Sequence, residues 1–511
     1  MAKKFTHTQA NWTLRKGSSL AALLLVVTLA ASEPPAKELS GRVMGDAVAG
    51  VCVRYQATQI QTLTDRTGQF HLPLRAGAVT AGVPGFFIST GEEFQNQIVL
   101  RLRPVPAGDN PNYVWVDPRK DSKGPQNCAS CHEEIYREWA GSAHGRSATN
   151  RNFLDLYAGA RNPKNAKHDW NLLKERSTGA SVCAACHAPT VDFADEGFTD
   201  FRKINGVSSQ GVHCDFCHKI QDVALDKLGT EHGRFAYKVL LPHKEQVFFG
   251  PLDDATRGEE SYSPLYKESR YCASCHEGTV LGAKVYTTYS EWLASPARKQ
   301  GKQCQGCHMQ PTGIMSNFAP GHGGVERDPK TLASHRLPGG ELKQLQSSVS
   351  VGTTTRRLDD GIEVRCTTLA TNVGHRVPTG FIDRHLLLVV DGYEGAGRRV
   401  KTIAGPMLSA AAGEGSALEG ALAGHAGIFF GRLIADADDN SPVPFWRSAK
   451  ELSDTRLMPD QPVVSTWQFS KATVRLHVRL IYRPFFQAVT SAKGWANRDI
   501  IVHEEIIPLR K

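Results

Sequence analysis

Both ends of the chain alternate hydrophobic with polar positions in short segments separated by turns. Residues 39–104 show no helical period, and their main apolar segments predict strands at 50–55, 62–74 and 98–102. Near the other end, an Ala- and Gly-rich loop at 409–428 interrupts a second series of such segments. That series predicts strands at 347–354, 362–371, 385–390, 463–469 and 473–482. Each end is therefore expected to fold as a β-sandwich.

The first 32 residues have the composition of a secretion signal peptide. A basic segment with Lys3, Lys4, Arg15 and Lys16 precedes a run of twelve mostly apolar residues, 20–31, which ends in small residues. A membrane-spanning helix needs about 20 apolar residues, so a cleaved signal is favoured over a retained anchor, which stays open. The segment has no twin-arginine pair, so general secretion to the periplasm or cell surface is expected.

Ten of the twelve cysteines fall into five Cys-x-x-Cys-His motifs. Two cysteines three residues apart lie on one face of a helical turn, so both thiols can reach the two vinyl groups of one haem. The histidine that follows lies one turn beyond the first cysteine and can bind the haem iron. The sequence therefore predicts five covalently bound c-type haems. The motifs are Cys128, Cys131 and His132; Cys183, Cys186 and His187; Cys214, Cys217 and His218; Cys272, Cys275 and His276; and Cys304, Cys307 and His308.

Three other uses of these cysteines fit the sequence less well. A thioredoxin-like redox pair needs a βαβ context and no histidine after the second cysteine. Zinc is the strongest rival, because the second and third cysteine pairs, and the fourth and fifth, could form two four-thiolate sites. Five pairs would leave one pair over, however, and zinc does not require a histidine after every pair. Cysteines this close in one helical turn are also poor disulfide partners.

The spacing of the motifs indicates an internal repeat. They start at 128, 183, 214, 272 and 304, so intervals of 55, 31, 58 and 32 residues alternate long and short. Tyr136-Arg-Glu-Trp-Ala-Gly-Ser follows the first motif, and Tyr289-Ser-Glu-Trp-Leu-Ala-Ser follows the fourth. His144 in the first copy corresponds to Ala297 in the second, which suggests a ligand role for His144. The two Trp side chains are expected to pack in the core or against a haem face.

The motif region is short for the cofactor that it is predicted to carry. Residues 128–308 provide about 36 residues per haem, too few to enclose each haem in its own core. The haems are therefore expected to touch and to form a row of redox centres. We expect a multidomain chain with a mainly α, haem-packed core at 126–340, flanked by β-sandwich modules at 38–104 and 345–511. A Pro-, Asp- and Gly-rich linker is expected at 105–125.

Net charge argues against nucleic-acid binding. The formal charge is +9, and four of the positive charges lie in the signal segment, which leaves +5. Five haems would add ten propionates, partly offset by one net positive charge at each ferric centre. The haem-loaded protein would then be near neutral when oxidised and negative when reduced, so no basic groove is expected.

Each haem iron has a second axial position. Six methionines stand against thirteen histidines outside the motifs and the signal segment, which favours bis-histidine ligation and low reduction potentials. The preferred distal candidates are His144, His335, His375, His322 and His232, with His243 and His168 ranked lower. His213 adjoins Cys214 and is expected to point away from its own iron. Surface or packed positions are expected for His71, His385, His477 and His503, and His425 is undecided.

Residues 128–144, Cys-Ala-Ser-Cys-His-Glu-Glu-Ile-Tyr-Arg-Glu-Trp-Ala-Gly-Ser-Ala-His, resemble the opening of the cytochrome c554 family, and the likeness covers about 124–340. Members of this family carry several such motifs on short helices and take distal histidines from elsewhere in the chain. The resemblance implies that His144 is a distal ligand to a haem other than the one at Cys128. His335 and His375 resemble the SH…G and GHxxPTG elements of related multihaem proteins. The family's type member has four haems, so its ligand pairing does not transfer directly, and one five-coordinate haem stays open.

The Thr64–Phe70 turn, Thr-Asp-x-x-Gly-x-Phe, resembles the carboxypeptidase regulatory-like β-sandwich. No catalytic constellation accompanies it, so a structural or docking module is expected at the N-terminal end. Cys52 and Cys366, the two cysteines outside the motifs, lie one in each β region, and both a disulfide and two buried thiols are open.

Electron transfer through five haems, exchanged with redox partner proteins, is the leading functional hypothesis, and an electron carrier is favoured over a catalyst. The alternative is an oxidoreductase with one open haem iron that acts on a small nitrogen or sulfur species. A third hypothesis gives the β modules a structural role, in which they bind a partner or polymerise the haem core. A homo-oligomer and a redox complex at the outer surface or membrane are both left open.

Overall fold

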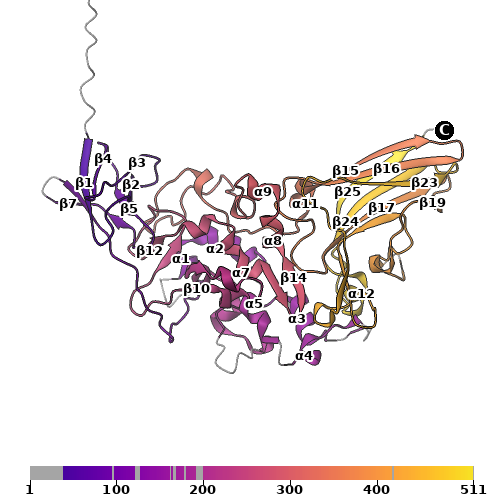
Figure 1. Ribbon diagram of the computed structural model, residues 1–511, viewed down its shortest axis with the longest axis horizontal. Helices are drawn as coiled ribbons and strands as arrows, with labels where there is room; N and C mark the ends of the chain where they lie inside the picture. Colours follow the sequence, from indigo (N-terminus) through magenta and orange to yellow (C-terminus); the bar gives the residue numbers. More distant parts are fainter. Residues whose placement is uncertain are drawn as a thin grey trace, which may run out of the picture.

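The computed structural model describes residues 38–94, 97–120, 127–161, 163–164, 168–177, 180–191, 200–416 and 419–509. Figure 1 shows three parts along the long axis, with a small β module at the N-terminal end, a middle part of short elements, and a larger β module at the C-terminal end. The predicted signal peptide, residues 1–32, lies outside the described residues. None of the described helices is long and apolar enough to cross a membrane.

The N-terminal module consists of two four-stranded sheets that share one hydrophobic core. One sheet has the order β4-β1-β8-β7 and the other β3-β2-β5-β6. In β4 the alternating pattern buries Phe70 and Leu72 between polar neighbours, and these side chains pack with Val53 and Tyr55 of the other sheet. The strands are β1 (Glu38–Met44), β2 (Cys52–Tyr55), β3 (Gln61–Leu63), β4 (Gln69–Pro73), β5 (Val79–Gly82), β6 (Ser89–Thr90), β7 (Glu92–Phe94) and β8 (Gln97–Arg101). The resemblance to a carboxypeptidase regulatory-like domain stays a prediction.

The middle part corrects the expectation of a mainly α core. Helices account for only 22% of the chain and strands for 30%. Each Cys-x-x-Cys-His motif lies in a short helical segment, and most of the chain between the motifs forms loops and two-stranded ribbons, with helices of at most nine residues. The helices are α1 (Cys128–Cys131), α2 (Glu133–Gly141), α3 (Arg151–Ala158), α4 (Leu172–Glu175), α5 (Ala184–His187), α6 (Cys214–Cys217), α7 (Arg270–His276), α8 (Thr288–Leu293), α9 (Pro296–Lys299) and α10 (Gln305–His308). The ribbons pair β9 (Ile220–Val223) with β10 (Tyr237–Val239), β11 (Phe248–Gly250) with β12 (Glu260–Tyr262), and β13 (Glu277–Val280) with β14 (Ala283–Thr287).

The C-terminal module is a second pair of sheets. One sheet has the order β15-β16-β23-β19, and the other has the order β18-β17-β24-β25 with β20 paired to β17. Trp467 and Phe469 of the first sheet pack with Leu388 and Val478 of the second. The elements are α11 (Leu342–Ser348), β15 (Val349–Arg357), β16 (Gly361–Ala370), β17 (His385–Tyr393), β18 (Arg399–Val400), β19 (Thr402–Ala404), β20 (Gly427–Phe430), β21 (Arg432–Ala435), β22 (Lys450–Asp454), β23 (Val463–Ser470), β24 (Arg475–Arg483), α12 (Gln487–Ala492) and β25 (Ile500–Pro508).

Polar contacts join the middle part to both β modules. Arg54 of β2 pairs with Asp253 at 2.8 Å, and the backbone N–H of Ala57 donates to Asp254. On the other side, the buried Lys493 ammonium lies 3.0 Å from Asp169. Residues 105–120, in the predicted linker, also contact the middle part, where the N–H of Asn110 donates to the carbonyl of Leu241.

The two cysteines outside the motifs are free thiols. Cys52 lies on β2 and is partly buried, and Cys366 lies on β16 and is fully buried. The two strands belong to β modules at opposite ends of the molecule (Figure 1).

Candidate haem-binding site

The five Cys-x-x-Cys-His motifs, numbered sites 1 to 5 in chain order, each form one helical turn. The N–H of His132 donates to the carbonyl of Cys128 over 2.8 Å, and His218 and His308 make the same bond to Cys214 and Cys304 over 2.9 Å. This bond closes the turn so that the histidine follows the first cysteine by one turn of helix. The local geometry is the one that C-x-x-C-H attachment of a haem requires.

All five sites line one cavity in the middle part. Its volume is about 3570 Å³, and its walls include every one of the ten motif cysteines and five motif histidines. A pocket for one small ligand or cofactor usually has about 300–1,000 Å³. The cavity is therefore several times larger than a single-cofactor site and fits several macrocycles that share one space.

The motif histidines are oriented by backbone carbonyls. In four of the five, ring atom Nδ1 donates to a carbonyl oxygen, which fixes the ring and leaves Nε2 as the free nitrogen for a metal. The acceptors are Phe318 O for His132 (2.8 Å), Ser147 O for His187 (3.1 Å), Phe249 O for His218 (2.7 Å) and Pro338 O for His308 (2.8 Å). Such a second hydrogen bond is typical of histidines that bind metal ions.

Burial favours the uncharged form of three of these imidazoles. Loss of hydration lowers the pKa of His276 to about 3 and also lowers the pKa values of His187 and His218. A neutral imidazole keeps the lone pair that binds iron, whereas a protonated one cannot bind. Burial thus favours the ligand-competent form of His187, His218 and His276.

Two of the candidate distal histidines face a motif histidine across the cavity. The ring centres of His144 and His276 are 6.1 Å apart, and those of His375 and His308 are 6.2 Å apart. An imidazole nitrogen binds a first-row metal at about 2 Å, so two rings on opposite sides of one iron have centres about 6 Å apart. Both pairs therefore have the spacing of two axial ligands to one iron.

His335 and His232 also line the cavity. Burial, and to a lesser extent the neighbouring His218, lower the pKa of His335 to about 4. His335 Nδ1 donates to the carbonyl of Ala333. In the buried His232, Nε2 donates to the carbonyl of Thr279 over 3.0 Å, while Nδ1 makes no hydrogen bond to the described residues.

The other predicted candidates lie elsewhere. His322 and His243 are exposed, and neither they nor His168 are among the residues that line the cavity. His213 is buried and its Nε2 bonds the Thr190 hydroxyl at 3.1 Å.

Cysteine thiols of different sites lie next to one another. The thiols of Cys128 and Cys214 are within hydrogen-bonding distance, which joins site 1 to site 3. The same contact joins site 2 to site 4 through Cys186 and Cys275, and site 4 to site 5 through Cys272 and Cys304. Within the described residues, no group of three or more His, Cys, Asp or Glu side chains is arranged to hold a metal ion. The four-thiolate geometry that zinc needs is thus not formed there.

Aromatic rings flank the motif histidines. They were not predicted, because they follow no periodic pattern along the chain. Phe153 stacks on His187 with ring centres 4.1 Å apart, and Tyr266 stacks on His218 at 5.6 Å. Phe318 lies 5.9 Å from His132. These rings fix the orientation of the imidazoles and keep the walls of the cavity apolar.

Comparison with protein families matches residues 127–219 to the family described as cytochrome c554 and c-prime. A comparison with curated proteins gives no match. Among solved structures, the chain is similar to a penta-haem cytochrome c552 from Thermochromatium tepidum, with a TM-score of 0.52 and 21% sequence identity. The similarity covers 75% of this chain and 97% of that chain. At this identity the likeness concerns the fold. Together with the motifs around one cavity, these findings support a multihaem c-type cytochrome.

Proposed function

We propose that this chain is an exported electron-transfer protein that carries five haems, one at each Cys-x-x-Cys-His motif. The observation that carries the proposal is the single cavity whose wall contains all five motifs. Bound haem would supply reversible one-electron chemistry at its iron. The residues of the chain attach the macrocycles, orient the axial imidazoles and exclude water.

The contacts between cysteines support a branched row of centres. Site 1 adjoins site 3, sites 2 and 5 both adjoin site 4, and Cys217 of site 3 lies near Cys275 of site 4. Site 4 would then be the junction of the row. For distal ligands we propose His144 at site 4 and His375 at site 5, supported by the ring spacings. His335 is proposed for site 3 because, of the two motif histidines that lower the pKa of its imidazole, His218 has the larger effect and His132 the smaller.

The test is a haem count on the purified mature protein. A pyridine haemochrome assay with intact mass is expected to give five haems per chain and the mass of a chain from which the signal has been removed. A colourless protein, or one that holds zinc, would overturn the proposal. Fewer haems would overturn the count of five.

A second candidate function is an oxidoreductase with an open iron at site 1 or site 2. It is considered because the distal histidines proposed above, His144, His375 and His335, are assigned to sites 4, 5 and 3, which leaves sites 1 and 2 without an assigned second imidazole. An iron without a second imidazole could bind a small nitrogen or sulfur species. Optical and EPR spectra with carbon monoxide or nitric oxide distinguish the two functions, since haems that are all six-coordinate and unreactive would exclude the oxidoreductase.

A further inference from the structure

The two Tyr-x-Glu-Trp segments bind equivalent backbone positions, each just before a different motif. Helix α2 carries Trp139, whose indole N–H donates to the carbonyl of Val212 over 2.8 Å. Helix α8 carries Trp292, whose indole N–H donates to the carbonyl of Lys302 over 2.9 Å. Each carbonyl lies two residues before the first cysteine of a motif, at site 3 and site 5 respectively. The two segments are therefore equivalent in structure as well as in sequence.

The backbone beyond each Trp repeats the same contacts. The N–H of Val212 donates to the carbonyl of His144 over 3.1 Å, and the N–H of Lys302 donates to the carbonyl of Ala297 over 3.0 Å. His144 and Ala297 thus occupy equivalent positions. The repeat pairs site 1 with site 4, and site 3 with site 5.

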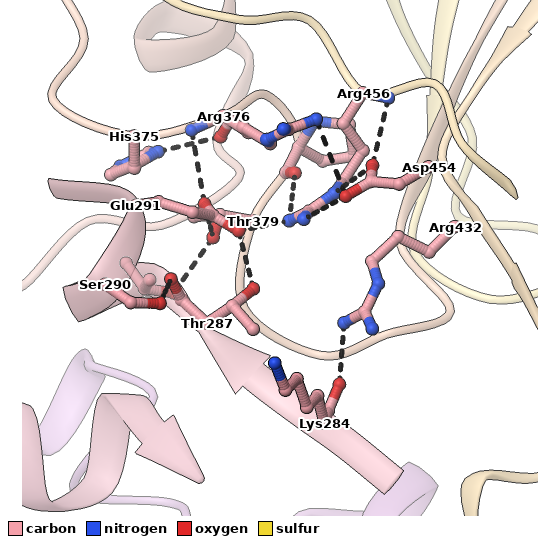
Figure 2. A network of polar contacts seen from close by, with 12 residues as sticks. Lys284, Thr287, Ser290, Glu291, His375, Arg376, Thr379, Arg432, Asp454 and Arg456 are labelled. Carbon is pink, nitrogen blue, oxygen red and sulfur yellow. Dashed lines mark hydrogen bonds and ion pairs between the residues drawn. The ribbon is translucent and has the colours of Figure 1, made fainter. Parts of the chain in front are cut away.

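The Glu of the second copy, Glu291, binds the loop that carries His375. Its Oε2 accepts a hydrogen bond from the backbone N–H of Arg376 over 3.2 Å and from the Thr379 hydroxyl over 2.8 Å. Nδ1 of His375 donates to the carbonyl of Arg376 over 2.8 Å. The carboxylate therefore holds the residue that also orients the imidazole (Figure 2).

The Glu of the first copy, Glu138, does the same for a different loop. Its Oε2 accepts a hydrogen bond from the backbone N–H of His335 over 2.7 Å. Two residues from equivalent positions of the repeat thus reach the backbone of two loops that are distant in sequence. Each of these loops carries a histidine that lines the cavity.

The other carboxylate oxygen of Glu291 is held by partners that are buried or partly buried. Its Oε1 accepts hydrogen bonds from the Arg456 guanidinium and the Thr287 hydroxyl, both over 2.6 Å. The side chains of Arg456 and Glu291 are only 6% and 8% exposed. Asp454 binds the other face of Arg456, and Figure 2 shows these charged groups meeting beside the His375 loop. Charged hydrogen bonds shielded from water are stronger and more directional than neutral ones.

We propose that Glu138 and Glu291 are positioning residues that hold two distal histidines, His335 and His375, over their haem irons. The inference rests on the proposed function, because it requires these histidines to be axial ligands. Outer hydrogen-bonding partners of metal ligands commonly set the ligand geometry, and their loss weakens metal binding about 10–100-fold.

The test measures how many haems of the reduced holoprotein bind carbon monoxide, and how much ferric haem is high-spin by EPR. His375→Ala is expected to add about one carbon monoxide-binding haem per chain. Glu291→Ala and Thr379→Val are expected to add a fraction of one, since each frees the His375 loop without removing the ligand. Thr379→Ser keeps the hydroxyl and is expected to match the parent protein. Thr379→Val changes little in volume, so it reports on the contact even where Glu291→Ala fails to fold.

Variants in the first copy of the repeat test the proposal independently. Glu138→Ala is expected to act on the site served by His335, and His335→Ala sets the full effect there. Glu134→Gln is the matched control, because Glu134 lies one turn earlier on α2 and pairs at the surface with Arg137. If His375→Ala adds no carbon monoxide-binding haem, the proposed ligation fails. If it adds one while neither Glu291→Ala nor Thr379→Val adds any, the positioning role is wrong and the ligation stands.

Discussion

At the scale of single residues, the most unusual feature is an ion pair without access to water beside site 3. Lys219 follows the motif histidine His218, and its ammonium lies 2.8 Å from the Asp215 carboxylate, with both side chains 0% exposed. Asp215 also accepts hydrogen bonds from the Tyr113 hydroxyl over 3.0 Å and from the N–H of Val116 over 2.8 Å. Burial lowers the pKa of Lys219, and the Asp215 charge opposes that shift. The pair is therefore charge-balanced only while both partners are present.

Removing one partner should cost more stability than removing both. Lys219→Met leaves the Asp215 carboxylate buried without a cation, which costs about 3–5 kcal/mol of unfolding free energy. In the double variant, Asp215→Asn with Lys219→Met, no charge is left buried, so a smaller loss is expected. Guanidinium unfolding of the holoproteins, followed by far-UV circular dichroism, measures both. A double variant that loses as much as the sum of the two single variants would contradict this account.

At the scale of elements, the two repeat copies approach sites 3 and 5 through equivalent glycines. Gly211 and Gly301 each lie three residues before a first motif cysteine, with φ values of 68° and 71°. A positive φ costs a residue with a Cβ atom about 1–3 kcal/mol, and at Gly211 the ψ of −136° lies outside the left-handed helical region as well. The surroundings differ, because a Cβ at Gly211 would collide with Ser147 Oγ and the His144 carbonyl, whereas one at Gly301 meets no described atom within 4 Å.

The same substitution should therefore have different effects in the two copies. Gly301→Ala is expected to cost about 1 kcal/mol from backbone strain. Gly211→Ala adds a collision and should cost about 3 kcal/mol. It should also displace the His144 loop and add carbon monoxide-binding haem, which Gly301→Ala should not do. Thermal unfolding and carbon monoxide titration of both variants check this. Equal stability losses in the two variants would show that the collision expected at Gly211 does not occur.

The sequence predicted elements well where one local pattern decides them. Strands expected at 362–371 and 463–469 correspond to β16 and β23, because period-two alternation matches the side-chain period of a strand. The strand expected at 385–390 corresponds to β17, a continuous apolar run that is buried on both faces. The mainly α core was wrong, since Cys-x-x-Cys-His specifies only a short helical segment and most of the chain between the motifs forms loops and ribbons. The Tyr-x-Glu-Trp repeat was visible, but its Glu residues were missed because their partners are backbone atoms of distant loops.

At the scale of the whole molecule, the sequence could not give the pairing of histidines with sites. Glu138 meets His335, and Glu291 meets the loop after His375, across long separations in the chain. Such contacts follow from the fold and leave no local pattern. His375 belongs to the chain of the C-terminal module, yet it lines the shared cavity. The larger β module thus lies at one end of the molecule and also contributes residues to the shared cavity.

The core of the N-terminal module is independent of the cavity, whereas the middle part is not. None of the buried residues of the N-terminal core is among those that line the cavity. In the middle part, buried side chains such as Phe216, Ile220 and Tyr157 form the cavity wall itself. The cavity of about 3570 Å³ is lined mainly by apolar surface. Without haem, water would hydrate that surface, and the free energy gained by burying it would be lost.

The haem-free chain should therefore lose its middle part and keep its β modules. Replacing the ten motif cysteines by serine prevents attachment, and limited proteolysis should then cut preferentially within residues 126–340. Fragments near 38–104 and 345–511 should resist digestion, because most of their core side chains pack on each other and not on a cofactor. The holoprotein, digested in parallel, should protect all three regions. Equal protection of residues 126–340 in the haem-free chain would show that the middle part folds without haem, and that the macrocycles are not needed as part of its core.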